Sequence, residues 1–145
     1  MILAIQKTET LEEAKTLLEG IVTDMIDACQ RMKSEKHDQT VLMIKEIVRN
    51  ELADLNLSAD QIAGRFNLTT SYVNRLFKQH TSLSIAGYIN ECRLIKAEEL
   101  IRTTTQTVAQ IAEQSGFSSM GTFFRLFKKK YGRTPGEMTR DLHGD

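Results

Sequence analysis

Two groups of basic and amide side chains stand at corresponding places in the sequence. Arg75 and Lys78, with Asn74 beside them, belong to the first group, and Arg125 and Lys128 belong to the second. Arginine can bind guanine through two hydrogen bonds, asparagine can bind adenine in the same way, and lysine neutralises phosphate. Residues 125–133 contain five basic residues and no acidic residue. These residue types in this arrangement are typical of a surface that binds nucleic acid.

The two groups lie in stretches of sequence that repeat each other. Residues 61–63 return as residues 110–112, an offset of 49, and residues 75–78 return as residues 125–128, an offset of 50. Each copy is expected to form a capped helix of about two turns, a short turn and a longer capped helix. The extra residue of the second copy is expected near the turn. This order describes a helix-turn-helix, whose second helix lies in the major groove of DNA.

Helical spacing divides the two longer helices into an inward and an outward side. The inward side chains are expected to be Val73, Leu76, Phe77, Phe123 and Phe127. The outward candidates for contact with DNA bases are Ser71, Asn74, Arg75, Met120, Gly121, Phe124 and Arg125. The candidates for contact with phosphates are Thr69, Thr70, Lys78, Ser118, Ser119, Lys128, Lys129, Lys130 and Arg133. The hydroxyl residues among them are expected to cap helices whose first backbone N–H groups favour phosphate oxygens.

The aromatic side chain of Phe124 fits two roles. On a helix with a wide apolar side it would belong to the core. Facing outward, it would contact a thymine methyl group together with Met120. The spacing alone leaves both roles open.

Seven blocks of sequence carry a family resemblance: residues 57–63, 68–78, 93–100, 108–112, 116–119, 123–129 and 132–135. Together they resemble the DNA-binding domain of the AraC/XylS transcriptional regulators. The resemblance implies two helix-turn-helix units that are joined by a long helix and read successive major grooves on one face of DNA. Two positions depart from the family's pattern. Phe124 stands where a small polar residue is more common, and Met138 stands where the last helix usually carries tyrosine.

An all-α fold with a long central helix is expected to position these residues. The chain has a single proline, few aromatic residues and much Leu, Ile, Ala, Glu and Lys, which favours helix. Residues 39–145 are expected to form the DNA-binding domain, with the first helix-turn-helix at about 58–80, a linker helix at about 84–101 and the second helix-turn-helix at about 107–131. The side chains expected on the buried side of the linker helix are Ile85, Ile89, Cys92 and Ile95. Further helices are expected at about 41–52 and from Thr134 onward, the latter with Pro135 in its first turn.

Residues 1–38 are expected to form an N-terminal linker segment, in which an amphipathic helix for docking or dimerisation begins at a capping box at Thr10. Apolar residues three and four apart then form a seam: Leu11, Ala14, Leu18, Ile21, Met25, Ala28 and Met32. Residues 33–39 are polar and aperiodic, so they are expected to be a linker or a cap before the next helix. The seam fits docking against a missing sensor domain as well as it fits a coiled-coil homodimer.

Composition excludes several classes of protein. With 145 residues, 41% hydrophobic and 26% charged, the chain can form one packed domain with an appendage. The formal net charge of zero neither favours nor excludes nucleic acid. No stretch approaches the roughly 18 apolar residues of a membrane span, and no basic and apolar leader opens the chain, so no membrane contact is expected. Cys29 and Cys92 are expected to be buried, reduced thiols of a cytoplasmic protein.

The leading hypothesis is sequence-specific binding of double-stranded DNA in transcriptional regulation, with RNA polymerase as a candidate partner. The alternative is a helical protein-interaction module that acts through the seam. An enzyme is not expected, because His37, His80 and His143 are scattered and no spacing suits a metal ion, a catalytic group or a cofactor.

Overall fold

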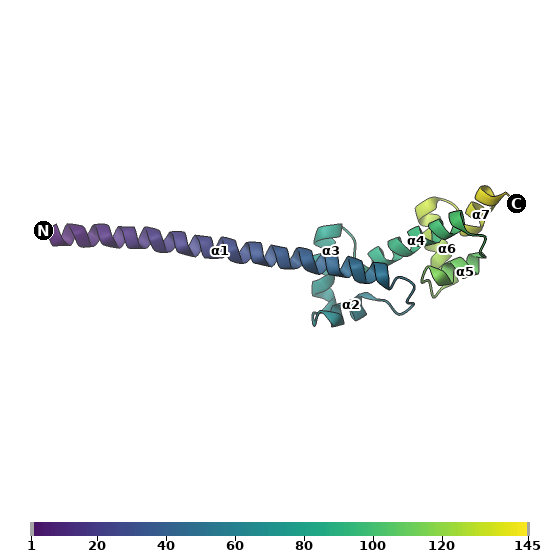
Figure 1. The fold of residues 1–145 in the computed structure, drawn as a ribbon, viewed down its shortest axis with the longest axis horizontal. Coiled ribbons are helices and arrows are strands. Elements are labelled where there is room, and N and C mark those ends of the chain that lie inside the picture. The colour runs from purple at the N-terminus through teal and green to yellow at the C-terminus, as the bar shows by residue number, and fades with distance from the viewer. Residues whose placement is uncertain (1, 145) are drawn as a thin grey trace. The chain divides into compact units, whose positions relative to one another are not determined.

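The structure, a computed structural model, describes residues 2–144, with side chains from residue 10 onward. This part of the chain forms helices and contains no strand (Figure 1). The helices are α1 (Ile2–Asn50), α2 (Ala59–Arg65), α3 (Thr70–Thr81), α4 (Ile85–Thr103), α5 (Val108–Gln114), α6 (Met120–Tyr131) and α7 (Pro135–His143). The chain divides into two compact units, residues 1–40 and residues 41–145. The expectation of an all-α fold is confirmed.

Helix α1 differs from the expectation for the N-terminal segment. It is continuous from Ile2 to Asn50, so Thr10 lies inside a helix and residues 33–39 form no linker. Those seven residues include Lys, Glu and Gln but no Gly or Pro, so they favour helix although their apolar periodicity is lost. In the first unit the large apolar side chains of the seam are exposed, at 61% for Leu18 and 62% for Met25. Cys29, which was expected to be buried, is exposed as well.

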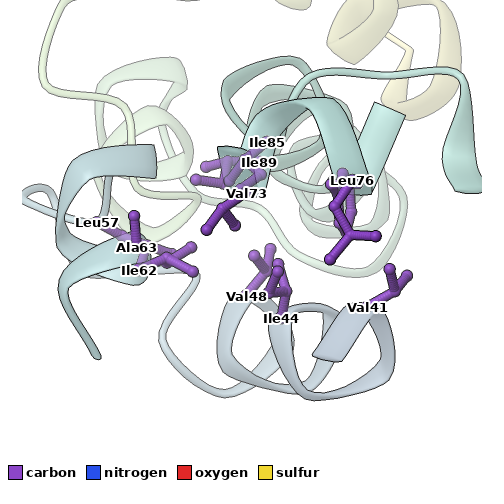
Figure 2. Packing of buried hydrophobic residues seen from close by; sticks show 11 residues of the cluster. Val41, Ile44, Val48, Leu57, Ile62, Ala63, Val73, Leu76, Ile85 and Ile89 are labelled. Atoms are coloured by element: carbon purple, nitrogen blue, oxygen red, sulfur yellow. The ribbon is translucent and has the colours of Figure 1, made fainter. Parts of the chain in front are cut away.

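The second unit contains two hydrophobic cores. The first core joins the last turns of α1 to α2, α3 and the first half of α4, and Ile44, Val73 and Ile89 are buried in it (Figure 2). The second core joins the second half of α4 to α5, α6 and α7, with Phe123 and Phe127 at its centre. Each helix-turn-helix therefore has its own core, and α4 belongs to both.

Helix α4 meets the two cores with different sides. Ile85 and Ile89 enter the first core, and Leu94, Ala97 and Ile101 enter the second. At about 100° per residue, the two buried stripes lie roughly a third of a turn apart around the helix. Ile95 was expected on the buried side, and this is wrong, because it is 52% exposed. The expectation assumed one buried stripe along the whole helix, whereas the stripe turns where α4 passes between cores.

The pair α2–α3 and the pair α5–α6 repeat each other, so the two expected helix-turn-helix units are confirmed. The turn has four residues in the first helix-turn-helix, 66–69, and five in the second helix-turn-helix, 115–119. The extra residue of the second copy therefore lies in the turn. Each turn contains one residue with positive φ, Asn67 at 53° and Gly116 at 94°. Asparagine and glycine are the residues that tolerate this conformation best.

Candidate nucleic-acid interface

Helix α3 presents the first candidate surface. Its N-cap is Thr69, whose hydroxyl oxygen accepts a hydrogen bond from the backbone N–H of Tyr72 at 3.2 Å. The side chains that it buries are Val73, Leu76 and Phe77, as expected. The side chains that it exposes include Ser71, Arg75 and Lys78. The Arg75 guanidinium lies 5.6 Å from the centroid of the Tyr72 ring, a cation–π contact that restrains the side chain and leaves its charge in place.

Asn74 points toward the protein as well as toward the candidate surface. It is half-buried, and its Oδ1 accepts a hydrogen bond from the backbone N–H of Ile85 at 3.0 Å. Ile85 is the first residue of α4, so this bond satisfies one of the free N–H groups at the start of that helix. Reading adenine through two bonds needs both the oxygen and the nitrogen of the amide. Base contact by Asn74 therefore competes with a structural bond that the sequence did not indicate.

The second helix-turn-helix has no counterpart of this bond. At the offset of 50, Asn74 corresponds to Phe124 and Ile85 corresponds to Pro135. Proline has no N–H, so a residue at position 124 has no donor to satisfy. Phe124 is 37% exposed, and its ring centroid lies 6.0 Å from that of Phe123. Phe124 thus packs along the edge of the core and still offers part of its ring to solvent.

Helix α6 presents the second candidate surface. Its N-cap is Ser119, whose hydroxyl oxygen accepts from the backbone N–H of Thr122 at 3.3 Å. Phe123 and Phe127 are fully buried, as expected. The exposed positions of the helix include Met120, Gly121, Phe124 and Arg125. Helices α3 and α6 therefore present different chemistry at corresponding positions, since Ser71 and Asn74 correspond to Gly121 and Phe124.

The basic residues at the end of α6 divide into two groups. Lys128 and Lys129 are exposed and make no ion pair with any residue that the structure describes. Lys130 forms an ion pair with Glu91 of α4. Arg133 pairs with Asp141 of α7, with 2.5 Å between Nη1 and Oδ2. Lys130 and Arg133 were both expected to face phosphates, and the structure gives each of them an intramolecular role.

The N-terminus of α3 carries a negative charge. The Thr70 hydroxyl donates to Oδ1 of Asp60 in α2 at 2.7 Å. The carboxylate occupies the positive end of the helix dipole, where a phosphate was expected. Ser118 is exposed one residue before the N-cap of α6, and among the described residues no carboxylate accepts a hydrogen bond at that helix end. The N-terminus of α6 is therefore the more favourable of the two for an anion.

A polar contact positions α6 on α4. The Tyr131 hydroxyl donates to the backbone carbonyl of Leu94 at 3.3 Å and also lies beside the Glu98 carboxylate. Tyr131, followed by Arg102, lowers the pKa of Glu98 below its usual value. Burial and the neighbouring Glu98 raise the pKa of the Tyr131 phenol. Tyr131, the last residue of α6, is thus held to α4.

Two of the histidines bond to backbone carbonyl groups. His80 Nδ1 lies 2.9 Å from the oxygen of Leu76, and His143 Nε2 lies 2.5 Å from that of Ile101. In the part of the chain that the structure describes, no three His, Cys, Asp or Glu side chains are grouped so that they could hold a metal ion. No helix there combines the length and the apolar character that a bilayer span requires. The exposed sides of α3 and α6 offer hydrogen-bond donors, positive charge and apolar contact.

Comparison with known proteins identifies relatives of this pair of units. A family model described as a helix-turn-helix domain matches residues 62–141. The HTH-type transcriptional activator RhaS of Escherichia fergusonii is 38% identical over 82 residues, which are 57% of this chain and 30% of that protein. The chain spans about a third of the length of the curated relatives that it matches.

Solved structures with the same architecture include two regulators. A transcriptional regulator of Chromobacterium violaceum with an AraC-type DNA-binding domain is 26% identical, with a TM-score of 0.62, and the match covers 74% of this chain and 95% of that chain. The DNA-binding domain of AdpA, in complex with a target DNA, is 18% identical with a TM-score of 0.66, and the match covers 70% of this chain and 90% of that one. At that identity the second likeness concerns the fold alone.

Proposed function

Because the chain belongs to the AraC/XylS family of helix-turn-helix proteins, we propose that it binds specific sequences of double-stranded DNA and regulates transcription. The observation that carries the proposal is the repeated unit, which buries the apolar side of α3 and of α6 and exposes the opposite side. Binding would rest on hydrogen bonds, apolar contact and charge, with no covalent step.

Helices α3 and α6 would each enter a major groove, and neighbouring major grooves on one face of DNA lie about 34 Å apart. The two helices would read different bases, because Ser71 and Asn74 correspond to Gly121 and Phe124. A single chain would therefore recognise an asymmetric site. A palindromic site would need a second chain.

The proposed base contacts are expected to contribute unequally to DNA binding. Arg75 and Arg125 are exposed at the same position of each helix and would each bind guanine. Phe124, with Met120, would contact a thymine methyl group. Asn74 would contribute less, because its Oδ1 already accepts from the backbone of Ile85.

The proposed phosphate contacts come mainly from three lysines. Lys78, Lys128 and Lys129 are exposed, and each would neutralise one phosphate and release its counterions. The backbone N–H groups at the start of α6, after Ser118 and Ser119, would add a further phosphate site. Lys130 and Arg133 would contribute less, because each is paired with a carboxylate.

Selection of binding sites from random duplexes by the purified chain tests the proposal. The expected result is an asymmetric sequence with two conserved blocks about one helical turn apart, which binds far more tightly than random DNA. A titration of random duplex at low salt separates the alternative, since a protein-interaction module would show no salt-dependent binding. Failure to enrich any sequence would overturn the proposal.

The seam of α1 exposes large apolar side chains, among them Leu18 and Met25. We propose that it packs against a further domain of the parent protein, since the curated relatives are about three times as long as their matched segments. A homodimer through the same seam is the competing arrangement. Sedimentation velocity at several concentrations tests the homodimer, because self-association makes the sedimentation coefficient rise with concentration. Contact with RNA polymerase would be a separate property of the DNA-bound protein.

A further inference from the structure

Arg93 lies in the middle of α4, between the two cores. It is 8% exposed, and its guanidinium donates from Nε to the carbonyl oxygen of Leu52 at 3.2 Å and from Nη2 to that of Asp54 at 2.7 Å. Leu52 packs against the first core, whereas Leu94, the next residue of α4, belongs to the second. Arg93 therefore ties the loop after α1 to the point where α4 passes from one core to the other.

Gly116 approaches the same point from the turn between α5 and α6. It is buried and has φ 94°. A Cβ atom at this position would lie 2.2 Å from the carbonyl oxygen of Leu52 and 2.7 Å from Nε of Arg93. Phe117, the next residue, is part of the second core. Any side chain larger than hydrogen at position 116 would therefore push the turn between α5 and α6 away from the loop that follows α1.

The contact among Leu52, Arg93 and Gly116, called the joint below, is polar. Burying a guanidinium without a carboxylate partner is costly, and burial lowers the pKa of Arg93, although Asp54 acts in the opposite direction. The two carbonyl groups lie just beyond the C-terminal end of α1, where a cation is favoured. Among the described residues none belongs to both hydrophobic cores, and α4 is the helix that contributes to each. The joint adds a second, directional link.

We propose that the joint fixes the orientation of the second helix-turn-helix relative to the first, and so sets the spacing at which α3 and α6 meet DNA. Arg93 is then a positioning residue, which acts through the geometry of the two units. The part of the proposal that concerns DNA rests on the proposed function. The part that concerns orientation does not.

The orientation can be measured without DNA, by residual dipolar couplings of backbone amides in the full chain. In the wild-type protein the couplings of α2–α3 and of α5–α6 are expected to fit one common alignment tensor. Arg93→Met and Gly116→Ala are expected to require two tensors of different magnitude, because the units then move separately. Where Arg93→Met does not fold, Arg93→Lys takes its place under the same criterion, since it keeps the charge but not the two-pronged guanidinium.

Two variants serve as matched controls. Arg102→Met removes one positive charge from α4 at a side chain that is 53% exposed. Gly132→Ala places alanine at φ 76° with no atom within 4 Å, so it adds backbone strain without a close approach. Both controls are expected to retain one tensor. If folded Arg93 and Gly116 variants also retain one tensor, the joint does not fix the orientation and the proposal is overturned.

The consequence for DNA is tested on the selected site and on the same site with one base pair inserted between its two blocks. The insertion turns one block by about 36° relative to the other, and the wild-type protein is expected to lose at least about tenfold in affinity. The joint variants are expected to bind the original site about tenfold more weakly, to lose less than about threefold on insertion, and to bind a single block normally. An unchanged insertion penalty would overturn the role in spacing. If the wild-type protein binds no selected DNA, the proposed function fails while the orientation result stands.

Discussion

Asn74 links the first recognition helix to the start of α4, and the loss of this link should be measurable as stability. Asn74→Ala removes the acceptor for the Ile85 N–H and is expected to lower the free energy of unfolding by about 1 kcal/mol, as for a lost N-cap. Asn74→Asp keeps an acceptor at the positive end of the helix and should retain most of that stability. Chemical denaturation followed by circular dichroism measures both, with Ser71→Ala at an exposed position as the control. Equal losses in the Ala and Asp variants would contradict this role.

Arg75 and Lys129 are expected to affect binding in different ways. Arg75→Ala should cost about 1–3 kcal/mol on the selected site and relax the preference at one base position. Lys129→Ala should weaken specific and random DNA about equally and reduce the slope of log affinity against log salt by about one. Fluorescence anisotropy titrations at several salt concentrations distinguish the two results. Direct readout by Arg75 is wrong if its variant loses the same affinity on both kinds of DNA.

Lys130 provides a matched comparison for Lys129, because the two residues are neighbours with the same side chain. Lys130 is paired with Glu91, whereas Lys129 makes no ion pair with a described residue. Lys130→Ala is therefore expected to leave the salt slope of DNA binding nearly unchanged. The same titrations measure it, and a slope reduced as much as in Lys129→Ala would show that the pair with Glu91 opens on DNA.

At the scale of the elements, helical periodicity and capping residues predicted most of the helices in residues 41–145. The helices expected to start at about 58, 107 and 134 have N-caps at Ser58, Thr107 and Thr134, because a cap needs only residues close in sequence. Ile95 was misplaced because α4 serves two cores, which no local pattern reveals. The break expected at residues 33–39 was wrong, because α1 continues through them. A polar segment without Gly or Pro can remain helical without an apolar side to bury.

The candidate site was predictable in outline but not in the use of each charge. Lys130, Arg133 and Asn74 have the right type and spacing for DNA, and all three are engaged by groups far along the chain or on the next helix. Arg93 appeared only as part of a family motif, because its acceptors are backbone carbonyls about forty positions away in sequence. Such partners carry no side-chain signal that sequence analysis could detect.

The contact between α6 and α4 predicts how stability depends on pH. The pKa of Glu98 is lowered in the folded protein, chiefly by Tyr131 and then by Arg102, so its stabilising contribution is fully present above its unfolded value of 4.5. The contribution is lost as pH falls through the lower, folded value. Glu98→Gln should therefore reduce the loss of stability between about pH 5 and pH 3. Thermal unfolding across this range measures it, and Tyr131→Phe should act in the same direction. Parallel curves for wild type and Glu98→Gln would contradict the contact.

At the scale of the whole molecule, the net charge of zero is the sum of two unlike parts. Residues 41–145 contain 14 basic and 11 acidic residues, whereas residues 1–40 contain 5 basic and 8 acidic residues. The excess of positive charge therefore lies with the two helix-turn-helix units. A neutral total is compatible with DNA binding because the affinity depends on the charges near the phosphates.

Both hydrophobic cores lie within residues 41–145, and the first buried residue in the chain order of those cores is Val41. Removal of residues 1–40 is therefore expected to leave a cooperatively folded protein with the same preferred DNA sequence, since the recognition helices, α4 and the joint are all retained. Thermal unfolding and site selection with the shortened chain measure this. A broad, non-cooperative transition would mean that α1 stabilises the fold beyond its last turns. A changed preferred sequence would mean that residues 1–40 take part in recognition.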